Sequence, residues 1–182
     1  MLGLGGDLMS GGYIGDTLLA SYVSDFTSDA DGWSAYSVEG TLTLAGGQTA
    51  PGSSATGEWL KGTFDTTQTS GSGIQIANFG PTGLTTGDYL VITYDVYLLD
   101  DSGKWDPEGD SDPVSHRVAI MGIASTTLVD LDTLTSAGPL TLTSTGGAQR
   151  TLILEVSTAD DRPQAGAVFY IKSIVATLYR PL

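Results

Sequence analysis

The chain has 182 residues, the size of a single domain, and no cysteine, which excludes disulfides and thiolate metal sites. Its formal net charge is −14 with only 7 Lys and Arg, which argues against binding to nucleic-acid phosphates or to anionic membranes. Charged residues make up only 15% of the chain and 25 residues are glycine, so the polar surface must consist mostly of Ser, Thr and Gly. This composition suits β-sheet surfaces and suits helices poorly.

The first 20 residues differ from the rest of the chain. Glycines alternate there with apolar side chains, at a density that disfavours a helix by about 1 kcal/mol per glycine. We expect residues 1–20 to form an arm and residues 21–182 to form the folded domain. The arm is either a disordered tail or a segment that becomes buried on a neighbouring subunit, and we favour docking because permanently exposed leucines are unfavourable. The side chains expected to contact the partner are Leu2, Leu4, Leu8, Met9, Tyr13, Ile14, Leu18 and Leu19.

From Ser21 onward, apolar and polar residues alternate in short runs separated by turn residues. The expected strands cover residues 34–45, 57–64, 73–79, 88–99, 115–124, 126–131, 139–143, 149–157 and 167–179. The clearest pattern places five apolar side chains on one strand face, namely Leu90, Ile92, Tyr94, Val96 and Leu98. About nine short strands without a defensible helix predict an all-β fold, a two-layer antiparallel β-sandwich of the jelly-roll type.

No catalytic motif stands out. His116, the only histidine, lies in an expected strand, and no Gly-x-Ser-x-Gly nucleophile elbow or phosphate-binding loop is present. The 21 acidic residues always allow a pair of carboxylates to be nominated for glycoside hydrolysis, so such a pair is not evidence for it. We therefore expect a protein that is not an enzyme and that uses no cofactor.

One polar and aromatic set is a candidate surface for a glycan or a protein partner. Its members fall on the outward phases of their strands, and the alternative is an ordinary solvated or partner-covered sheet face. The strand residues are Asp95, Tyr97, Arg117, Glu155, Tyr170 and Lys172. Trp105, in an acidic loop, is either an exposed anchor or a side chain that folds back over the end of the sandwich. Trp33 and Trp59 are expected in the core.

The loop from Asp100 to Asp112 is the densest cluster of oxygen ligands in the chain. Its spacing does not match the EF-hand pattern, so we expect a solvated loop and no metal site. The alternative is a calcium ion bound in this loop.

Three stretches resemble the jelly rolls of carbohydrate-binding-module-like domains: Asp25-Phe26 with Asp31-Gly32-Trp33 and 41–44, then 88–96, then 168–175. The resemblance extends over about residues 22–180. Many such modules hold a structural calcium between an early and a late acid. Here the late position resembles Lys172, which implies an ion pair with the Asp25 region in place of the metal. In this interpretation, Phe26 and Trp33 seal the end of the sandwich.

An apolar glycine-rich arm before a jelly roll also resembles the small accessory proteins of tailed-phage virions. That resemblance implies a capsid cement or decoration subunit, located on the capsid surface. Its partners would be the major capsid protein and sister subunits, in a homotrimer. The alternatives are a carbohydrate-binding module that adheres to host glycans and a tail or fibre subunit.

Overall fold

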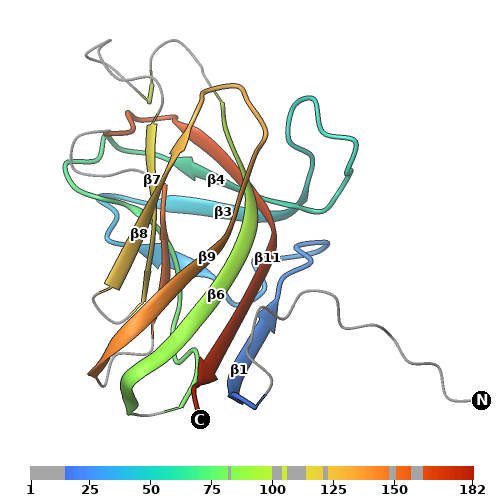
Figure 1. Cartoon of the computed structure of the whole chain (residues 1–182). Helices are drawn as coiled ribbons and strands as arrows, with labels where there is room; N and C mark the ends of the chain where they lie inside the picture. Colours follow the sequence, from blue (N-terminus) through green and yellow to red (C-terminus); the bar gives the residue numbers. More distant parts are fainter. Residues whose placement is uncertain are drawn as a thin grey trace, which may run out of the picture.

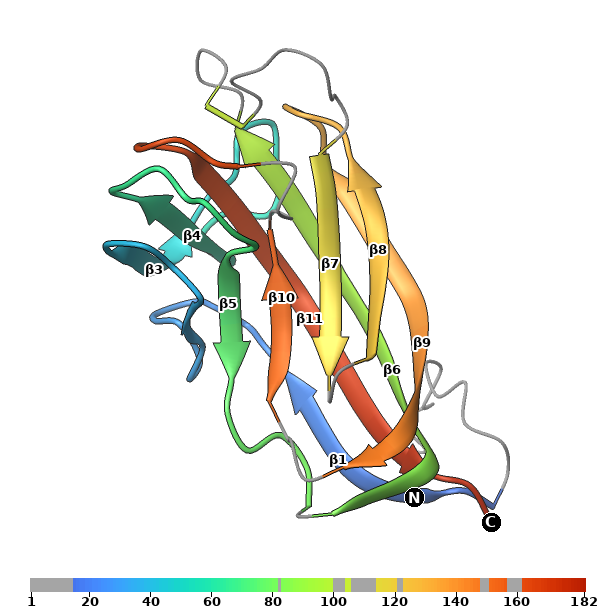
Figure 2. The same cartoon turned by 90° about the vertical axis from the view of Figure 1, so that its left-hand side faces the viewer.

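The computed structural model describes residues 15–81, 83–99, 104–105, 114–120, 123–147, 151–156 and 162–182. These residues form eleven strands and no helix, arranged as two antiparallel sheets packed face to face (Figures 1 and 2). The predicted all-β sandwich is confirmed. In this described part of the chain, no helix is long and apolar enough to cross a membrane.

The larger sheet has the strand order β3-β4-β11-β6-β9, and β1 pairs with β11 beside this path. Its strands are β1 (Thr17–Val23), β3 (Leu42–Gln48), β4 (Trp59–Phe64), β6 (Leu84–Leu99), β9 (Thr135–Gly147) and β11 (Val168–Arg180). The smaller sheet has the order β2-β5-β10-β7-β8. Its strands are β2 (Ser34–Tyr36), β5 (Gly73–Ile76), β7 (Val114–Ile120), β8 (Ile123–Val129) and β10 (Leu152–Glu155).

The core lies between the two sheets and follows the predicted alternation of β6. The five apolar residues expected on one face of this strand are all buried, with at most 2% of each exposed. Burial of such a side chain contributes about 1.5–3 kcal/mol of hydrophobic free energy, so this face sets which side of the strand turns inward. These side chains are Leu90, Ile92, Tyr94, Val96 and Leu98.

Some expected strands have different bounds. The expected strand 34–45 is two strands in different sheets, because Ser37 and Gly40 adopt left-handed φ angles of 49° and 68° and turn the chain from one sheet to the other. The expected strand 115–124 contains the connection of the β7–β8 hairpin. The edge strand β1 begins at Thr17, so residues 17–20 belong to the sheet and not to the expected arm.

The corner between β1 and β2 is structural, as predicted. Phe26 is fully buried and Trp33 is 4% exposed. The Asp31 carboxylate accepts hydrogen bonds from the backbone N–H groups of Asp25 (2.8 Å) and Phe26 (2.9 Å). These bonds hold Phe26 at its left-handed φ of 46°, a conformation that a non-glycine residue adopts only when its surroundings fix it.

Three of the β-bulges in the larger sheet lie at similar levels across its strands. One lies in β11 between Lys172 and Val175, one in β9 opposite Ile92 and Tyr94, and one in β3 between Ala45 and Gln48. The first two flank β6 on both sides at the level of residues 92–95. Bulges increase the local twist and redirect side chains, so the face above this level differs from the face below it.

Candidate functional site

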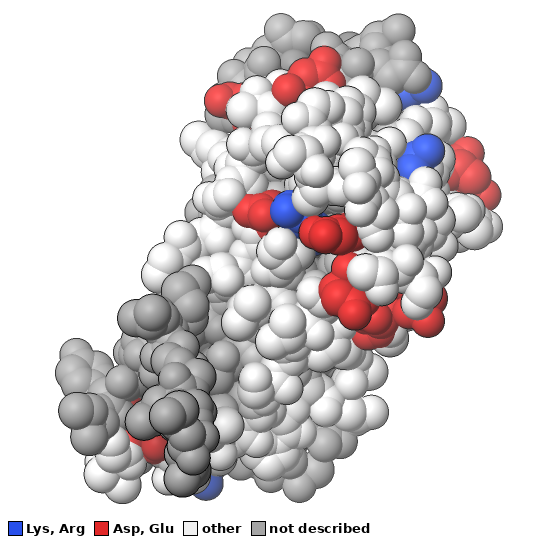
Figure 3. All heavy atoms as spheres, turned by 90° about the vertical axis from the view of Figure 1, so that its right-hand side faces the viewer, with Lys and Arg blue, Asp and Glu red and all other residues white. Residues whose placement is uncertain are grey.

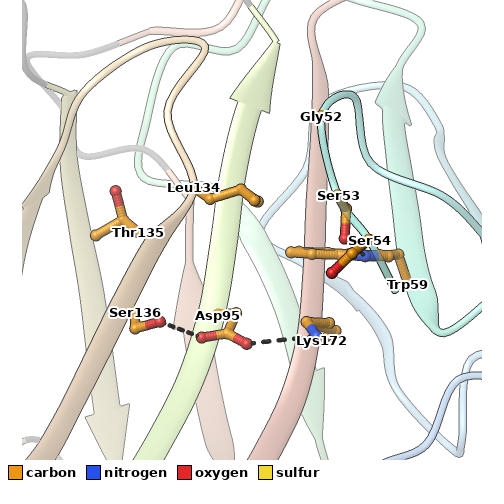
Figure 4. A pocket seen from close by; sticks show the side chains of 9 residues that line it. All are labelled: Gly52, Ser53, Ser54, Trp59, Asp95, Leu134, Thr135, Ser136 and Lys172. Atoms are coloured by element: carbon orange, nitrogen blue, oxygen red, sulfur yellow. Dashed lines mark hydrogen bonds and ion pairs between the residues drawn. The ribbon is translucent and has the colours of Figure 1, made fainter. Parts of the chain in front are cut away.

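A hollow of about 240 Å³ lies on the outer face of the larger sheet (Figure 4). Three strands supply its floor: Trp59 from β4, Asp95 from β6 and Lys172 from β11. The loop 49–57 forms one wall, and the chain entering β9 forms the opposite wall. The wall residues are Gly52, Ser53, Ser54, Leu134, Thr135 and Ser136.

A row of polar side chains crosses the floor of the hollow. The Ser136 hydroxyl donates a hydrogen bond of 2.6 Å to Asp95 Oδ1, and Lys172 Nζ lies 3.8 Å from Asp95 Oδ2 (Figure 4). Because 3.8 Å is longer than a hydrogen bond, this ion pair leaves the ammonium donors and one carboxylate oxygen available to a ligand. The expected ion pair of Lys172 with the Asp25 region is wrong, because the regular register of β11 with β6 pairs Lys172 with Asp95.

Trp59 forms the base of the hollow but has no exposed surface. Its Nε1 donates a hydrogen bond of 3.0 Å to Ser53 Oγ, and Lys172 Nζ lies 5.2 Å from its ring centroid, within range of a cation–π interaction. Ser53 Oγ also accepts from the Ala55 N–H, which ties the loop over the indole ring. Trp59 is buried as predicted, but it packs in a small cluster on the outer face of the sheet and not between the sheets.

The end of the hollow nearest the C-terminal end of β6, which is the upper end in the orientation of Figure 1, is closed by two tyrosines. Tyr97 and Tyr170 are 5% and 8% exposed and pack edge to face, with ring centroids 6.1 Å apart. The Tyr97 hydroxyl donates a hydrogen bond of 2.9 Å to Asp132. Burial, followed by the neighbouring Asp132 carboxylate, raises the pKa of Tyr97 to about 12, and burial also raises the pKa of Tyr170.

The structure brings together only part of the surface predicted from the sequence. Asp95, Tyr97 and Tyr170 lie with Lys172 on one face, as their strand phases predicted. Glu155 lies on β10 in the smaller sheet and is only 4% exposed, so it is not part of this surface. The remaining strand member, Arg117, is the register partner of Glu155, and its side chain lies outside the described part of the chain.

Trp105 is fully buried, so the alternative in which it folds back over the end of the sandwich is correct. Its Nε1 donates hydrogen bonds to the carbonyl oxygens of Leu99 (3.1 Å) and Val168 (3.2 Å), and its ring packs edge to face on Phe64. An indole held in this way closes the end of the sandwich and presents no surface to a sugar or a partner.

Several predictions fall on residues outside the described part. The arm residues Leu2, Leu4, Leu8, Met9, Tyr13 and Ile14 belong to this group, as does most of the loop from Asp100 to Asp112 with its alternative calcium site. Leu18 and Leu19 are described: the first is 57% exposed and the second packs against the main core. Within the described ranges, no three His, Asp or Glu side chains form a group that could hold a metal ion.

The walls of the hollow were missed by sequence reasoning. Ser53, Ser54 and Ser136 resemble any other surface serine of this chain, and only their tertiary positions distinguish them. Of the wall residues, only Leu134 could have been noticed in the sequence, because it is a leucine in a polar turn. It is 45% exposed.

No family model and no curated protein matches this chain. Among solved structures, the CBM22-1 xylan-binding domain from Paenibacillus barcinonensis Xyn10C is similar, with a TM-score of 0.52, 15% identity, and coverage of 92% of this chain and 97% of that chain. An arabinose-bound MgGH51 α-L-arabinofuranosidase matches with a TM-score of 0.54 and 14% identity, over 88% of this chain but 27% of that chain.

A third similar structure contains the CBM22-1 and GH10 modules of the Clostridium thermocellum xylanase 10B, complexed with xylohexaose. The TM-score is 0.51 and the identity 11%, over 87% of this chain and 28% of that chain. At such low identities these likenesses establish the fold alone. The predicted resemblance to carbohydrate-binding-module-like jelly rolls is confirmed at that level, and none of the three structures is a virion protein.

Proposed function

We propose that this protein binds a neutral glycan, without catalysis, in the hollow on the larger sheet. The observation that carries the proposal is the polar row of Lys172, Asp95 and Ser136 beside the half-exposed Leu134. The glycan-binding alternative to the capsid role is favoured by this geometry, and the fold supports it.

The chemistry of the hollow matches that of a sugar ring. A sugar carries neighbouring hydroxyls, each both a donor and an acceptor, together with an apolar C–H surface. Asp95 offers acceptors, Lys172 offers donors and Ser136 offers a hydroxyl, while Leu134 provides an apolar wall. The volume of 240 Å³ is below the range of about 300–1,000 Å³ of most small-molecule sites, which suits a single sugar unit. Stacking of a sugar on Trp59 would require the loop 49–57 to move, since the ring is covered.

Charge selects against acidic glycans. The whole chain has a net charge of −14, and a polyanionic ligand would be repelled at long range. The ammonium of Lys172 is already neutralised in part by Asp95. A neutral glycan is not repelled by the net charge and does not depend on an unpaired ammonium group.

The test is isothermal titration calorimetry against a panel of neutral glycans, beginning with arabinose, xylan and xylohexaose because the similar structures are named for these ligands or complexed with them. Loss of a charge-assisted hydrogen bond costs about 1.5–3 kcal/mol, so Asp95→Ala should weaken binding roughly 10- to 100-fold. Glu58→Gln, which changes an exposed carboxylate outside the hollow, is the matched control and should bind as the wild type does. A panel without any binding, or an Asp95→Ala protein with wild-type affinity, would refute the proposal.

A second candidate function is a subunit of a protein assembly, such as a capsid decoration protein. The edge strand β1 favours it, because the strand has no charged residue and no proline, and its Leu18 and Val23 are 57% and 67% exposed. Such an edge is a template for pairing with another chain. Sedimentation velocity should then show an oligomer, a trimer in the capsid reading, that Val23→Lys dissociates. A wild-type protein that stays monomeric at high concentration and fails to bind capsids counts against this function.

A further inference from the structure

The hollow has one closed end and one open end along the strands. At the upper end, the next outward residues after Asp95 and Lys172 are Tyr97 and Tyr170, and both are almost fully buried. Ala50, 1% exposed, packs on this tyrosine pair. The sheet surface is therefore covered beyond the polar row, and a ligand cannot continue upward along β6 and β11.

Both sides of the hollow are also bounded. The loop 49–57 is fixed over Trp59 by the Ser53 hydroxyl, and its ends are joined by a hydrogen bond of 3.0 Å from the Gly57 N–H to Thr49 Oγ1. On the other side, Leu134 projects beside β6 at the entry to β9 (Figure 4). A ligand seated on the polar row is enclosed on three sides.

The fourth side opens onto the lower part of the sheet. The next outward row below the β11 bulge contains Thr93, Val175 and Val23, which are register partners on neighbouring strands. Val23 is 67% exposed and the other two are partly exposed. Figure 3 shows a broad area without Lys, Arg, Asp or Glu below the charged cluster on this face. A neutral chain can lie on this area without desolvating a charge.

From this shape we infer that the hollow recognises the end of a glycan chain and not an internal segment. The inference rests on the proposed function, because it assigns the ligand of the same site. The terminal sugar unit contacts the polar row, and the following units extend downward over Thr93 and Val175. An internal segment needs an exit at both ends, and the buried tyrosine pair blocks one of them.

The test asks whether the amount of protein bound follows the number of glycan chain ends or the mass of glycan. Xylan, arabinan, β-glucan and mannan are each offered intact and after limited acid hydrolysis, at equal mass, as soluble ligands in calorimetry. A chain-end binder shows a stoichiometry, in moles of protein per gram of glycan, that rises in proportion to the number of chain ends. Stoichiometry that stays constant per gram overturns the inference and leaves the proposed function standing. A protein that binds none of the four, in either form, overturns both.

A pair of variants gives an independent readout. Val175→Arg places a long side chain in the open path, and it should lower the affinity for oligosaccharides of two or more units at least tenfold while leaving the affinity for the single sugar unchanged. Thr43→Arg adds the same side chain at an exposed position on β3, away from the hollow, and should change neither affinity. Equal weakening of the single sugar and the longer oligosaccharides by Val175→Arg contradicts the inference.

Discussion

The upper and lower halves of the outer face of the larger sheet are built on the same two strands and differ in almost every property. In the upper half, Trp59, Tyr97 and Tyr170 are buried under loops, and a charged pair lies beside them. In the lower half, outward residues such as Val175 and Thr177 are partly exposed. Both halves follow one alternation along β6, whereas in β11 the bulge between Lys172 and Val175 shifts the alternation by one residue.

The bulges account for this difference. Those of β11 and β9 lie at the boundary between the halves, and the bulge of β3 precedes the loop 49–57 that covers Trp59. Each adds one residue to a strand and so changes where the following segment is directed. The candidate site thus depends on local insertions in the larger sheet.

The largest expected effect is that of removing the base of the upper half. Trp59→Ala should lower the free energy of unfolding by about 3–5 kcal/mol, because it deletes a fully buried ring and leaves a cavity under the loop. Val91→Ala, on the outer face of the lower half, should cost less than about 1 kcal/mol. Urea denaturation measures both, and similar costs would show that the two halves do not differ in packing.

The next largest effect is expected at Asp88, whose hydrogen bonds anchor the lower half. The buried Asp88 carboxylate accepts two hydrogen bonds from Arg180, at 2.9 and 2.8 Å, and two from Thr85, so it joins the start of β6 to the end of β11. Asp88→Asn should cost about 2 kcal/mol at neutral pH, since it leaves buried donors and acceptors mismatched. At roughly 2–4 °C per kcal/mol for a domain of this size, the Tm should fall by roughly 4–8 °C.

This effect should depend on pH. The hydrogen bonds from Arg180 hold the pKa of Asp88 below its ordinary value of 3.8. The carboxylate therefore stabilises the folded state above that value, and its contribution disappears as the pH falls through the lower pKa of the folded protein. Melting curves should show the difference between wild type and Asp88→Asn shrinking only below about pH 4. A difference that is constant from pH 7 to pH 2 would show that the ion pair is not its source.

A smaller effect is expected at the closed end of the hollow. Tyr97→Phe removes the hydrogen bond to Asp132 and should cost about 1 kcal/mol at pH 7. Burial keeps the hydroxyl neutral and raises its pKa from 10.0 to about 12. The stabilisation by the neutral form is complete below pH 10 and is lost as the pH rises from 10 to 12. The wild type should therefore lose stability more steeply than the variant over that interval, and parallel curves would contradict the assignment.

The smallest effect is expected on the open surface. Thr141→Lys, at an exposed position of β9 in the lower half, should change the free energy of unfolding by less than about 0.5 kcal/mol. Ser136→Lys, on the same strand in the upper half, should abolish glycan binding because it fills the hollow and removes the hydrogen bond to Asp95. Melting curves measure the effect of each Lys substitution on stability, and calorimetry measures its effect on glycan binding. If Thr141→Lys proves as harmful to stability as Trp59→Ala, the lower half is buried in an interface.

Local patterns predicted much of the scaffold. The alternation in β6 identified its inward face correctly, and the stretch from Asp25 to Trp33 was correctly interpreted as a sealing corner. The outward phases also placed Asp95, Tyr97 and Tyr170 on one surface. These successes share a cause: strand periodicity and turn chemistry are expressed by residues adjacent in the chain.

The failures involve contacts between distant residues. The expected strand 34–45 ended just before Gly46-Gly47 and the expected strand 139–143 began at Pro139, but both places lie in bulges within continuous strands. At Gly138, for example, φ is 102° and a Cβ would lie 2.5 Å from the Ile92 carbonyl oxygen, a close approach that only the partner strand creates. Glycine marks a turn and a bulge equally well in a sequence.

By itself, the sequence determined the fold class, the inward face of the central strand and a surface dominated by Ser, Thr and Gly, because these follow from composition and from a period of two residues. Only the tertiary structure decided that Glu155 belongs to the other sheet, that Trp105 points inward, and that Lys172 meets Asp95. Those outcomes depend on strand register and on bulges. Register is set by the sum of contacts across the whole sheet, and no single segment of the chain encodes it.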